Sequence, residues 1–325
     1  MDIYVKRDPQ SPLNVRLVLP LLELATKSGM DERQLSDKAS GIIKSRLAKS
    51  KDLPTTVARD EVETVLREVH RRAQRSHASD ALAVLSQASL YLCRILVSLN
   101  GQDVVVEMYQ ESLDDYLSRK ASQLAFSFFQ DWARRFPTLG WKLRESILEA
   151  SSKAVNLYRK CQVFQLLHVI LSQPDKVCVL FLVCRRVVHQ PQGEEPVATA
   201  TFHKALQKTI LDLITLSIDD QRGLSATQIK DLLKLVLFCI RQTRKTSDSP
   251  TIEVWDLAMW KALHDQLSSS NRFKSSSSVL DMCRQVESTA VQCKPPAGGK
   301  RKAELDAPIE TDPSKKSNRK KQKKK

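Results

Sequence analysis

The chain has 325 residues, 42% of them hydrophobic, and its 52 Lys+Arg against 37 Asp+Glu give a net charge of +15. Its 8 Gly argue against an ordinary nucleotide-binding enzyme, because phosphate loops need glycine for close backbone approach. The longest apolar runs, 82–99 and 177–188, contain arginines and fall short of the roughly 20 residues that span a bilayer. We therefore expect no transmembrane helix and, without the cleavage site of a secretory signal, a location in the cytosol or nucleus.

Apolar residues recur with the helical period through residues 1–293, a length that can bury a sizeable core. Ser11 should cap the first helix with Pro12 in its first turn, and Ser225 with Gln228 forms a capping box for a later one. No stretch alternates with a period of two for long enough to predict a strand. The predicted helices lie at about 12–28, 31–48, 56–74, 79–99, 102–118, 122–136, 138–159, 161–172, 174–189, 198–218, 226–245, 251–268 and 277–290.

The predicted helices differ in their faces. The helix at 56–74 is amphipathic, with Val57, Val62, Val65, Leu66 and Val69 inward, whereas 79–99 is apolar almost all round and must be covered on several sides. Such an alternation predicts an all-α fold, a HEAT- or armadillo-like α-solenoid of antiparallel helix pairs, in which Pro20 kinks the first helix. An irregular helical bundle is the alternative, since no sequence self-similarity defines the repeats.

Few residues suggest catalysis. The candidate metal-binding carboxylates of a polymerase or nuclease are Asp114–Asp115 and Asp219–Asp220, but adjacent helical residues diverge, so solvated surface or capping is the better interpretation. The sequence lacks phosphate-loop, dinucleotide, nucleophile-elbow and zinc-protease motifs, and its six histidines are dispersed. We expect a non-enzymatic chain without cofactors.

The seven cysteines are odd in number and lie mostly within apolar helical patterns, so we expect free buried thiols and no disulfide framework. A zinc site would need close ligand pairs. The nearest approaches are Cys178 and Cys184 with His189, or Cys161 with His168, and neither spacing is typical of zinc.

Residues 294–325 differ from the rest in composition, with four Pro, no aromatic residue and twelve Lys/Arg against four Asp/Glu. Such a segment cannot bury enough apolar surface to fold, so we predict a disordered basic tail after a helical domain of residues 1–293. Its two basic clusters fit a bipartite nuclear import signal and would also contact nucleic-acid phosphates; a merely solubilising tail is the alternative. The clusters comprise Lys300, Arg301, Lys302, Lys315, Lys316, Arg319, Lys320, Lys321, Lys323, Lys324 and Lys325.

A smaller basic patch, Arg67, Arg71, Arg72 and Arg75, ends the helix at 56–74. It is a candidate nucleic-acid contact, although favourable interaction with the negative end of the helix dipole explains such residues without a ligand. The four tryptophans could stack on bases, but at helical spacing we expect core positions for Trp132, Trp141, Trp255 and Trp260.

The stretches 88–96 (ASLYLCRIL) and 255–263 (WDLAMWKAL), followed by the lysine-rich end, resemble the C-terminal part of the DNA polymerase phi family. That family includes Myb-binding protein 1a of animals and the fungal DNA polymerase V. The resemblance implies helical repeats, a basic tail, a nucleolar location and a role in ribosomal RNA gene transcription, ribosome biogenesis and transcriptional co-regulation. Family members are much longer, and no motif in this chain carries polymerase residues.

Together these features predict a non-catalytic nucleolar scaffold with three kinds of partner: nucleic acid (DNA or RNA) on the tail, a nuclear import carrier, and proteins on the helical array. No membrane partner is expected. The alternative is a general HEAT-type protein-binding adaptor without direct nucleic-acid function.

Overall fold

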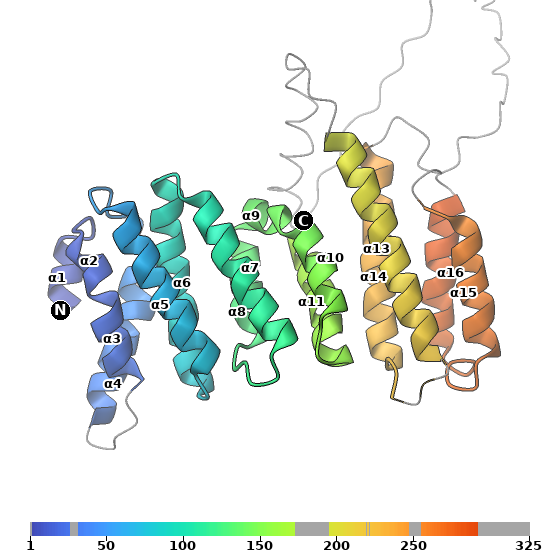
Figure 1. The fold of residues 1–325 in the computed structure, drawn as a ribbon, viewed down its shortest axis with the longest axis horizontal. Coiled ribbons are helices and arrows are strands. Elements are labelled where there is room, and N and C mark those ends of the chain that lie inside the picture. The colour runs from blue at the N-terminus through green and yellow to red at the C-terminus, as the bar shows by residue number, and fades with distance from the viewer. Residues whose placement is uncertain are drawn as a thin grey trace, which may run out of the picture. The chain divides into compact units, whose positions relative to one another are not determined.

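The computed structural model describes residues 2–26, 32–172, 195–218, 220, 222–246 and 255–291. Throughout these residues every regular element is a helix (Figure 1). The elements are α1 (Asp2–Arg7), α2 (Leu13–Arg16), α3 (Val18–Ala25), α4 (Arg33–Ile42), the π-helical turn η2 (Ile43–Leu47), α5 (Arg59–Arg75), α6 (Ser79–Ser98), α7 (Gln102–Ser118), α8 (Phe126–Arg135), α9 (Pro137–Lys142), α10 (Arg144–Ser152), α11 (Leu157–Leu171), α13 (Glu195–Ile218), α14 (Ala226–Thr246), α15 (Leu257–Ser269) and α16 (Ser277–Val291).

The helices between α5 and α14 form two layers (Figure 1). In one layer α5 contacts α7, α7 contacts α10 and α10 contacts α13; in the other, α6 contacts α8, α8 contacts α11 and α11 contacts α14. Further pairs flank them, α3 with α4 and α15 with α16. Because each pair rests mainly on its neighbours in sequence, the fold is the predicted all-α solenoid.

The helix α6 is the most deeply buried part of the array. Thirteen of its twenty residues are buried, against α3, α5, η2, α7 and α8. By length and a mean hydropathy of 1.6 it could also cross a membrane, the one such helix among the described residues, but 67% of that window is buried inside the array. We interpret it as a core helix, and the inward faces predicted for α5 and α6 are confirmed.

The N-terminal helix prediction is only partly correct. In place of one kinked helix, α2 ends at Arg16 and α3 begins at Val18. Pro20 has no N–H to donate to the carbonyl of Arg16, which accounts for the break. Ser11 does not cap α2 with its side chain, because its hydroxyl bonds that of Tyr4 at 2.7 Å.

The middle of the array also departs from the predicted boundaries. The predicted helix 138–159 is divided into α9 and α10, and α11 begins only after Asn156, whose side-chain oxygen accepts the N–H of Arg159 at 2.9 Å. By contrast, the predicted capping box is confirmed: Gln228 accepts the N–H of Ser225 at 2.8 Å and donates its own to the Ser225 hydroxyl at 3.3 Å. The helix predicted at 174–189 lies outside the described residues.

Two arginines close equivalent loops, one after α7 and one after α13. In the first loop Arg159 donates its guanidinium N–H groups to the carbonyls of Tyr116, Arg119 and Ser122. In the second loop Arg272 donates to the carbonyls of Ser217, Asp220 and Leu224. Carbonyls at a helix end lack helical partners, so these arginines satisfy them and attach each loop to a later part of the chain.

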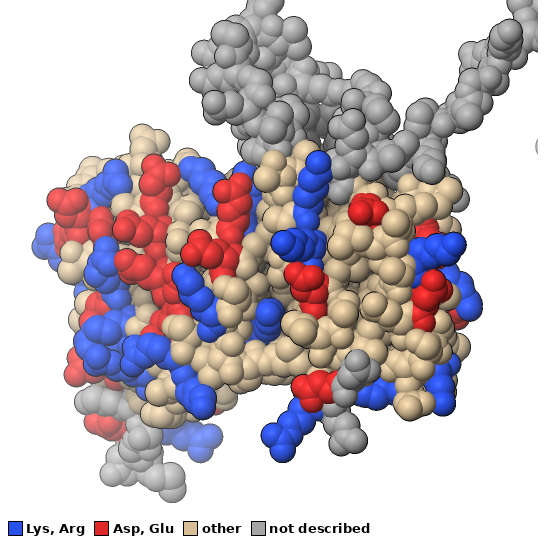
Figure 2. All heavy atoms as spheres, turned by 45° about the vertical axis from the view of Figure 1, so that its right-hand side comes forward, with Lys and Arg blue, Asp and Glu red and all other residues tan. Residues whose placement is uncertain are grey.

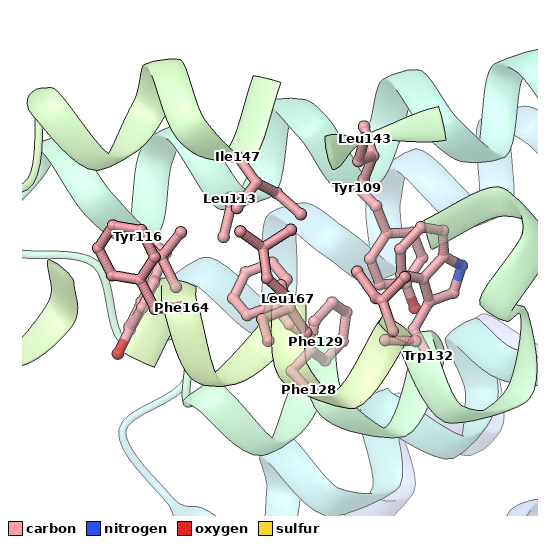
Figure 3. Close-up of a cluster of buried hydrophobic side chains, with 14 of the residues drawn as sticks. Tyr109, Leu113, Tyr116, Phe128, Phe129, Trp132, Leu143, Ile147, Phe164 and Leu167 are labelled. Atoms are coloured by element: carbon pink, nitrogen blue, oxygen red, sulfur yellow. The ribbon is translucent and has the colours of Figure 1, made fainter. Parts of the chain in front are cut away.

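An aromatic cluster fills the centre of the array between α7, α8 and α11 (Figure 3). Tyr109 stacks on Trp132 with ring centroids 4.3 Å apart, and Phe128 and Phe164 complete the cluster. The tryptophans Trp132, Trp255 and Trp260 are buried, which confirms the core interpretation, while Trp141 is half-buried beside Phe202.

Candidate functional site

The predicted patch on α5 consists of arginines that are mostly held in ion pairs. Arg67 lies 3.1 Å from Glu63 and 3.5 Å from Glu111 of α7. Glu68 accepts two hydrogen bonds from Arg71, at 2.7 and 2.8 Å, and one from Arg72 at 2.7 Å. These bonds, that from Arg71 above all, lower the pKa of Glu68 to about 2. Three of the four predicted cations are therefore in ion pairs, with Arg71 and Arg72 sharing the one carboxylate of Glu68.

The fourth, Arg75, ends α5 and has no ion-pair partner within the described part of the chain. It lines a cleft of about 360 Å³ with His77, Asp115, Arg119 and Ser122. Arg119 is bound to Asp115 at 2.8 Å, and the cleft lies at the C-terminal ends of α5 and α7. Helix C-termini disfavour anions, so these cations are best explained as partners of the helix ends.

Charge on the neighbouring surface is mixed. On the face shown in Figure 2, acidic and basic side chains are interspersed, and neither sign covers a continuous field. Within α7 itself there are no Lys, Arg or His residues but five carboxylates, those of Asp103, Glu107, Glu111, Asp114 and Asp115. A nucleic-acid backbone laid along this helix would meet no cation of α7 itself, and three of the five carboxylates are paired with Arg67, Arg119 and Lys142 outside it.

The other helix layer contains a second cleft, of about 350 Å³, between α8, α11 and α14. Its polar lining comes from all three helices. Buried Phe164 and Leu232 lie beneath, and the lining contains three glutamines, namely Gln130, Gln165 and Gln228. This groove, defined by those five residues, was not singled out in the sequence, because glutamines dispersed over three helices form no motif.

The candidate carboxylates that the structure describes belong to no metal-binding cluster. Asp115 is bound to Arg119 and is only 10% exposed, unlike the solvated position that we expected, and burial raises the pKa of Asp114. Asp220 accepts the N–H of Arg222 at 2.8 Å within the loop before α14 and caps no helix, while Asp219 lies outside the described residues. These contacts are structural.

Histidines and cysteines in the described ranges hold no metal cluster: no group of three or more His, Cys, Asp or Glu is placed to bind an ion there. Four cysteines there are free and buried, namely Cys93, Cys161, Cys239 and Cys283. Burial raises the pKa of Cys161 to about 11, so its thiol is protonated and unreactive at neutral pH. Cys178, Cys184 and His189 lie outside the described residues.

The predicted tail also lies beyond the last described helix, which ends at Val291. Its eleven candidate contact residues, and the domain division at residue 293, therefore stay predictions.

The comparison with protein families decides the relationship. A family model described as Myb-binding protein 1A-like, TPR repeats, matches residues 8–289. The chain belongs to this family. The resemblance inferred from 88–96, 255–263 and the lysine-rich end is thus confirmed, and the family description names helical repeats and no reaction.

Among curated proteins, the chain is similar to the Myb-binding protein 1A-like protein of Danio rerio, with 22% identity over 259 residues. The match covers 74% of this chain and 19% of that relative, so the chain spans about a fifth of the relative's length. No solved structure matches the chain. The family model describes the repeats as TPR, where the sequence predicted the HEAT or armadillo type; all three are solenoids of paired helices.

Proposed function

We propose that this member of the Myb-binding protein 1A-like family is a non-catalytic nuclear scaffold. The family match over residues 8–289 carries the proposal, and the two-layer helical array supports it, because stacked helix pairs present extended surfaces to protein partners. We place the scaffold in the nucleolus, in ribosomal RNA gene transcription and ribosome biogenesis. The name of the zebrafish relative suggests a Myb-type transcription factor as one partner.

Nucleic acid, DNA or RNA, would be bound through the basic tail. The tail carries twelve Lys/Arg against four Asp/Glu, and neutralising phosphates with such cations releases counterions whatever the base sequence. The pairing of Arg67, Arg71 and Arg72 with glutamates leaves the body patch a minor contribution, centred on Arg75. The same tail would serve a nuclear import carrier.

A second function, a protein-binding adaptor without direct nucleic-acid contact, is favoured by the ion pairs of Arg67, Arg71 and Arg72 and by the absence of Lys, Arg and His within α7. The two functions make opposite predictions for the purified chain with labelled nucleic acid.

The test compares the full chain with a full-length variant in which the eleven tail cations, residues 300–302, 315–316, 319–321 and 323–325, are changed to glutamine. Fluorescence anisotropy with a single-stranded RNA and a DNA duplex should show binding by the first protein that weakens steeply with salt, and at least a roughly tenfold loss in the second. Arg71→Gln is the control and should bind nearly as the unmodified chain does, because Arg71 lies on the helical array, outside the tail, in an ion pair with Glu68.

Equal binding by the tail variant would place contact on the array and contradict the tail assignment. If neither protein binds nucleic acid, the result favours the second function, a protein-binding adaptor without direct nucleic-acid contact. In cells, crosslinking and sequencing of bound nucleic acid should enrich ribosomal DNA or pre-ribosomal RNA, and enrichment of unrelated sequences alone would contradict the nucleolar role.

A further inference from the structure

The loops after α5, α7, α10, α13 and α15 lie along one edge of the array, the lower edge in Figure 1. Neighbouring loops are hydrogen-bonded to one another. The N–H of Gln123, after α7, donates to the carbonyl of Gln74 in α5 at 3.1 Å, and that of Val155, after α10, donates to the carbonyl of Leu117 in α7 at 2.9 Å. Further along, α10 contacts α13, and Arg272 bonds the loop after α13. These five loops, with Arg75 and the first turn of α11, form a surface that we call the loop edge.

The loop edge is basic. Among the described residues, its loops contain six Lys/Arg against one carboxylate, that of Asp220. The flanking helix ends add Arg75, Arg159 and Lys160 against Asp80. The described loops at 48–58 and 99–101, on the opposite edge, contain two Lys/Arg against one Asp/Glu. Positive charge therefore accumulates on one edge of the array.

Several of these cations are available to a ligand. Four are exposed and have no carboxylate partner within the part of the chain that the structure describes, namely Arg75, Lys120, Arg222 and Lys274. They come from four different loops or helix ends, and neighbouring helices pack about 8–10 Å apart, so the charges are spread along the edge. Exposed cations that lack a protein carboxylate can neutralise the phosphates of a nucleic acid.

Helix dipoles explain this excess of charge only in part. The C-termini of α5, α7, α10, α13 and α15 end at the loop edge and favour cations. The N-termini of α6, α8, α11, α14 and α16 begin at the same edge, and their opposite dipoles favour anions. Because the dipoles of each antiparallel pair largely offset one another, the charge of the side chains remains for a partner.

An exposed aromatic ring also lies within the loop edge. Tyr158, in the first turn of α11, is 63% exposed and directly precedes Arg159 and Lys160. Arg159 is bound to the loop after α7, which keeps the first turn of α11 beside that loop. Cations that follow a phosphate backbone, combined with an aromatic ring on which a base stacks, are typical of surfaces that bind single strands. A duplex keeps its bases stacked inside and does not use such a ring.

We propose that the loop edge binds single-stranded nucleic acid, with Arg75, Lys120, Arg222 and Lys274 contacting phosphates and Tyr158 stacking on a base. The inference rests on the proposed function and adds to the tail a contact on the helical array. Its ligand chemistry is a phosphodiester backbone with unpaired bases, which RNA and single-stranded DNA share.

The test starts from the tail variant, so that the array is measured without the tail cations. Changing the four exposed cations, Arg75, Lys120, Arg222 and Lys274, to glutamine gives an edge variant of this protein. Fluorescence anisotropy with a labelled single strand at low salt should show binding at least roughly tenfold weaker for the edge variant. The slope of log K against log salt should fall by about 3, since each phosphate contact of a single strand contributes about 0.7. RNA and DNA strands of one sequence should bind alike.

A matched control changes four exposed cations away from the loop edge, Lys49, Lys51, Lys204 and Lys208, and should weaken binding less than about twofold, because distant charges are screened. Tyr158→Ala should weaken single-strand binding at least about fivefold and leave duplex binding unchanged. Urea unfolding should give the same midpoint for all these proteins, since every substituted side chain is exposed.

The proposal is overturned if the edge variant and the control bind equally, if Tyr158→Ala has no effect, if only one of the RNA and DNA strands binds, or if the tail variant binds no single strand at low salt. An acidic protein segment would also suit a basic edge. An oligoglutamate that competes as strongly as an RNA of equal charge, with no effect of Tyr158→Ala, would assign the edge to such a partner instead.

Contact by the tail is measured separately, by comparing the unmodified chain with the tail variant. Failure of the proposed tail contact appears as equal binding by those two proteins, whereas failure of the loop edge appears as equal binding by the edge variant and its control. The two failures are therefore distinguishable.

Discussion

At the scale of single residues, the buried polar network around His70 combines stabilisation with pH sensitivity. Its Nδ1 lies 2.7 Å from the hydroxyl of Ser112 and its Nε2 3.0 Å from that of Ser89, which in turn bonds Tyr109 at 2.8 Å. Burial, with a smaller effect of Arg67, lowers the pKa of His70 to about 3, and burial lowers that of His203 to about 4. Both imidazoles are therefore neutral in the folded chain and protonate on unfolding at mildly acidic pH.

From this we predict a loss of stability on acidification. Because the folded pKa lies below the unfolded value of 6.5, the contribution of each histidine is complete above pH 6.5 and declines as the pH falls towards its folded pKa. Between pH 7 and pH 5 each should cost about 2 kcal/mol of unfolding free energy. The substitution His70→Leu should lower the free energy of unfolding by about 1–3 kcal/mol at pH 7, because it leaves Ser112 unpaired. Between pH 7 and pH 5 the free energy of unfolding of this variant should then fall less steeply than that of the unmodified chain.

Urea unfolding at pH 7 and pH 5 measures both effects. Glu68, with its pKa near 2, loses its contribution only below about pH 4.5 and does not interfere. His77→Gln, on an exposed side chain, is the control. If the free energy of unfolding of His70→Leu falls as much between pH 7 and pH 5 as that of the unmodified chain, the proton taken up on unfolding does not belong to His70.

At the scale of elements, the sequence predicts local features well and long-range ones not at all. The capping box of Ser225 and Gln228 spans four residues and could be identified directly, as could the inward face of α5. Asn156 is also a local cap, but it was missed because the apolar pattern continues across it. The hydrogen bonds from Arg159 to the loop after α7, which we call the Arg159 clamp, join residues 37–43 positions apart in the sequence. No local pattern encodes such contacts.

The candidate site shows the same limit. The α5 arginines could be found from their spacing, but their ion pairs depend on side-chain geometry and, for Arg67, on Glu111 of another helix. The groove glutamines come from three helices that only the packing brings together.

The Arg159 clamp should tolerate no other cation. Arg159→Lys retains the charge but offers a single nitrogen where the guanidinium serves three carbonyls and lies over the ring of Tyr116 at 4.7 Å. We expect a loss of about 1–2 kcal/mol, measured by urea unfolding, since hydrogen bonds from charged donors contribute more than neutral ones. Arg134→Lys, at an exposed ion pair of 3.9 Å, should change almost nothing. Equal effects of the two substitutions would contradict the clamp.

At the scale of the whole molecule, charge is divided between the two parts of the sequence. Residues 294–325 contribute +8 of the net +15, in about a tenth of the length. In the helical body a net charge of about +7 remains, and many of its Lys and Arg side chains lie in ion pairs, as around Glu68 and Asp115. Under the proposed function, this separation would let the array bind proteins while the tail supplies import and phosphate contact.

The division predicts that the tail is sufficient for nuclear import. Residues 294–325, fused to a reporter too large to diffuse through nuclear pores, should concentrate it in the nucleus, because both basic clusters can enter the acidic grooves of an import carrier. Changing Lys300, Arg301 and Lys302 to glutamine should reduce import sharply if the signal is bipartite, while leaving eight of the eleven cations for phosphate contact. If the reporter with the intact tail stays in the cytoplasm, the tail is not an import signal. Nuclear entry would then depend on the helical body or on a partner protein bound to it.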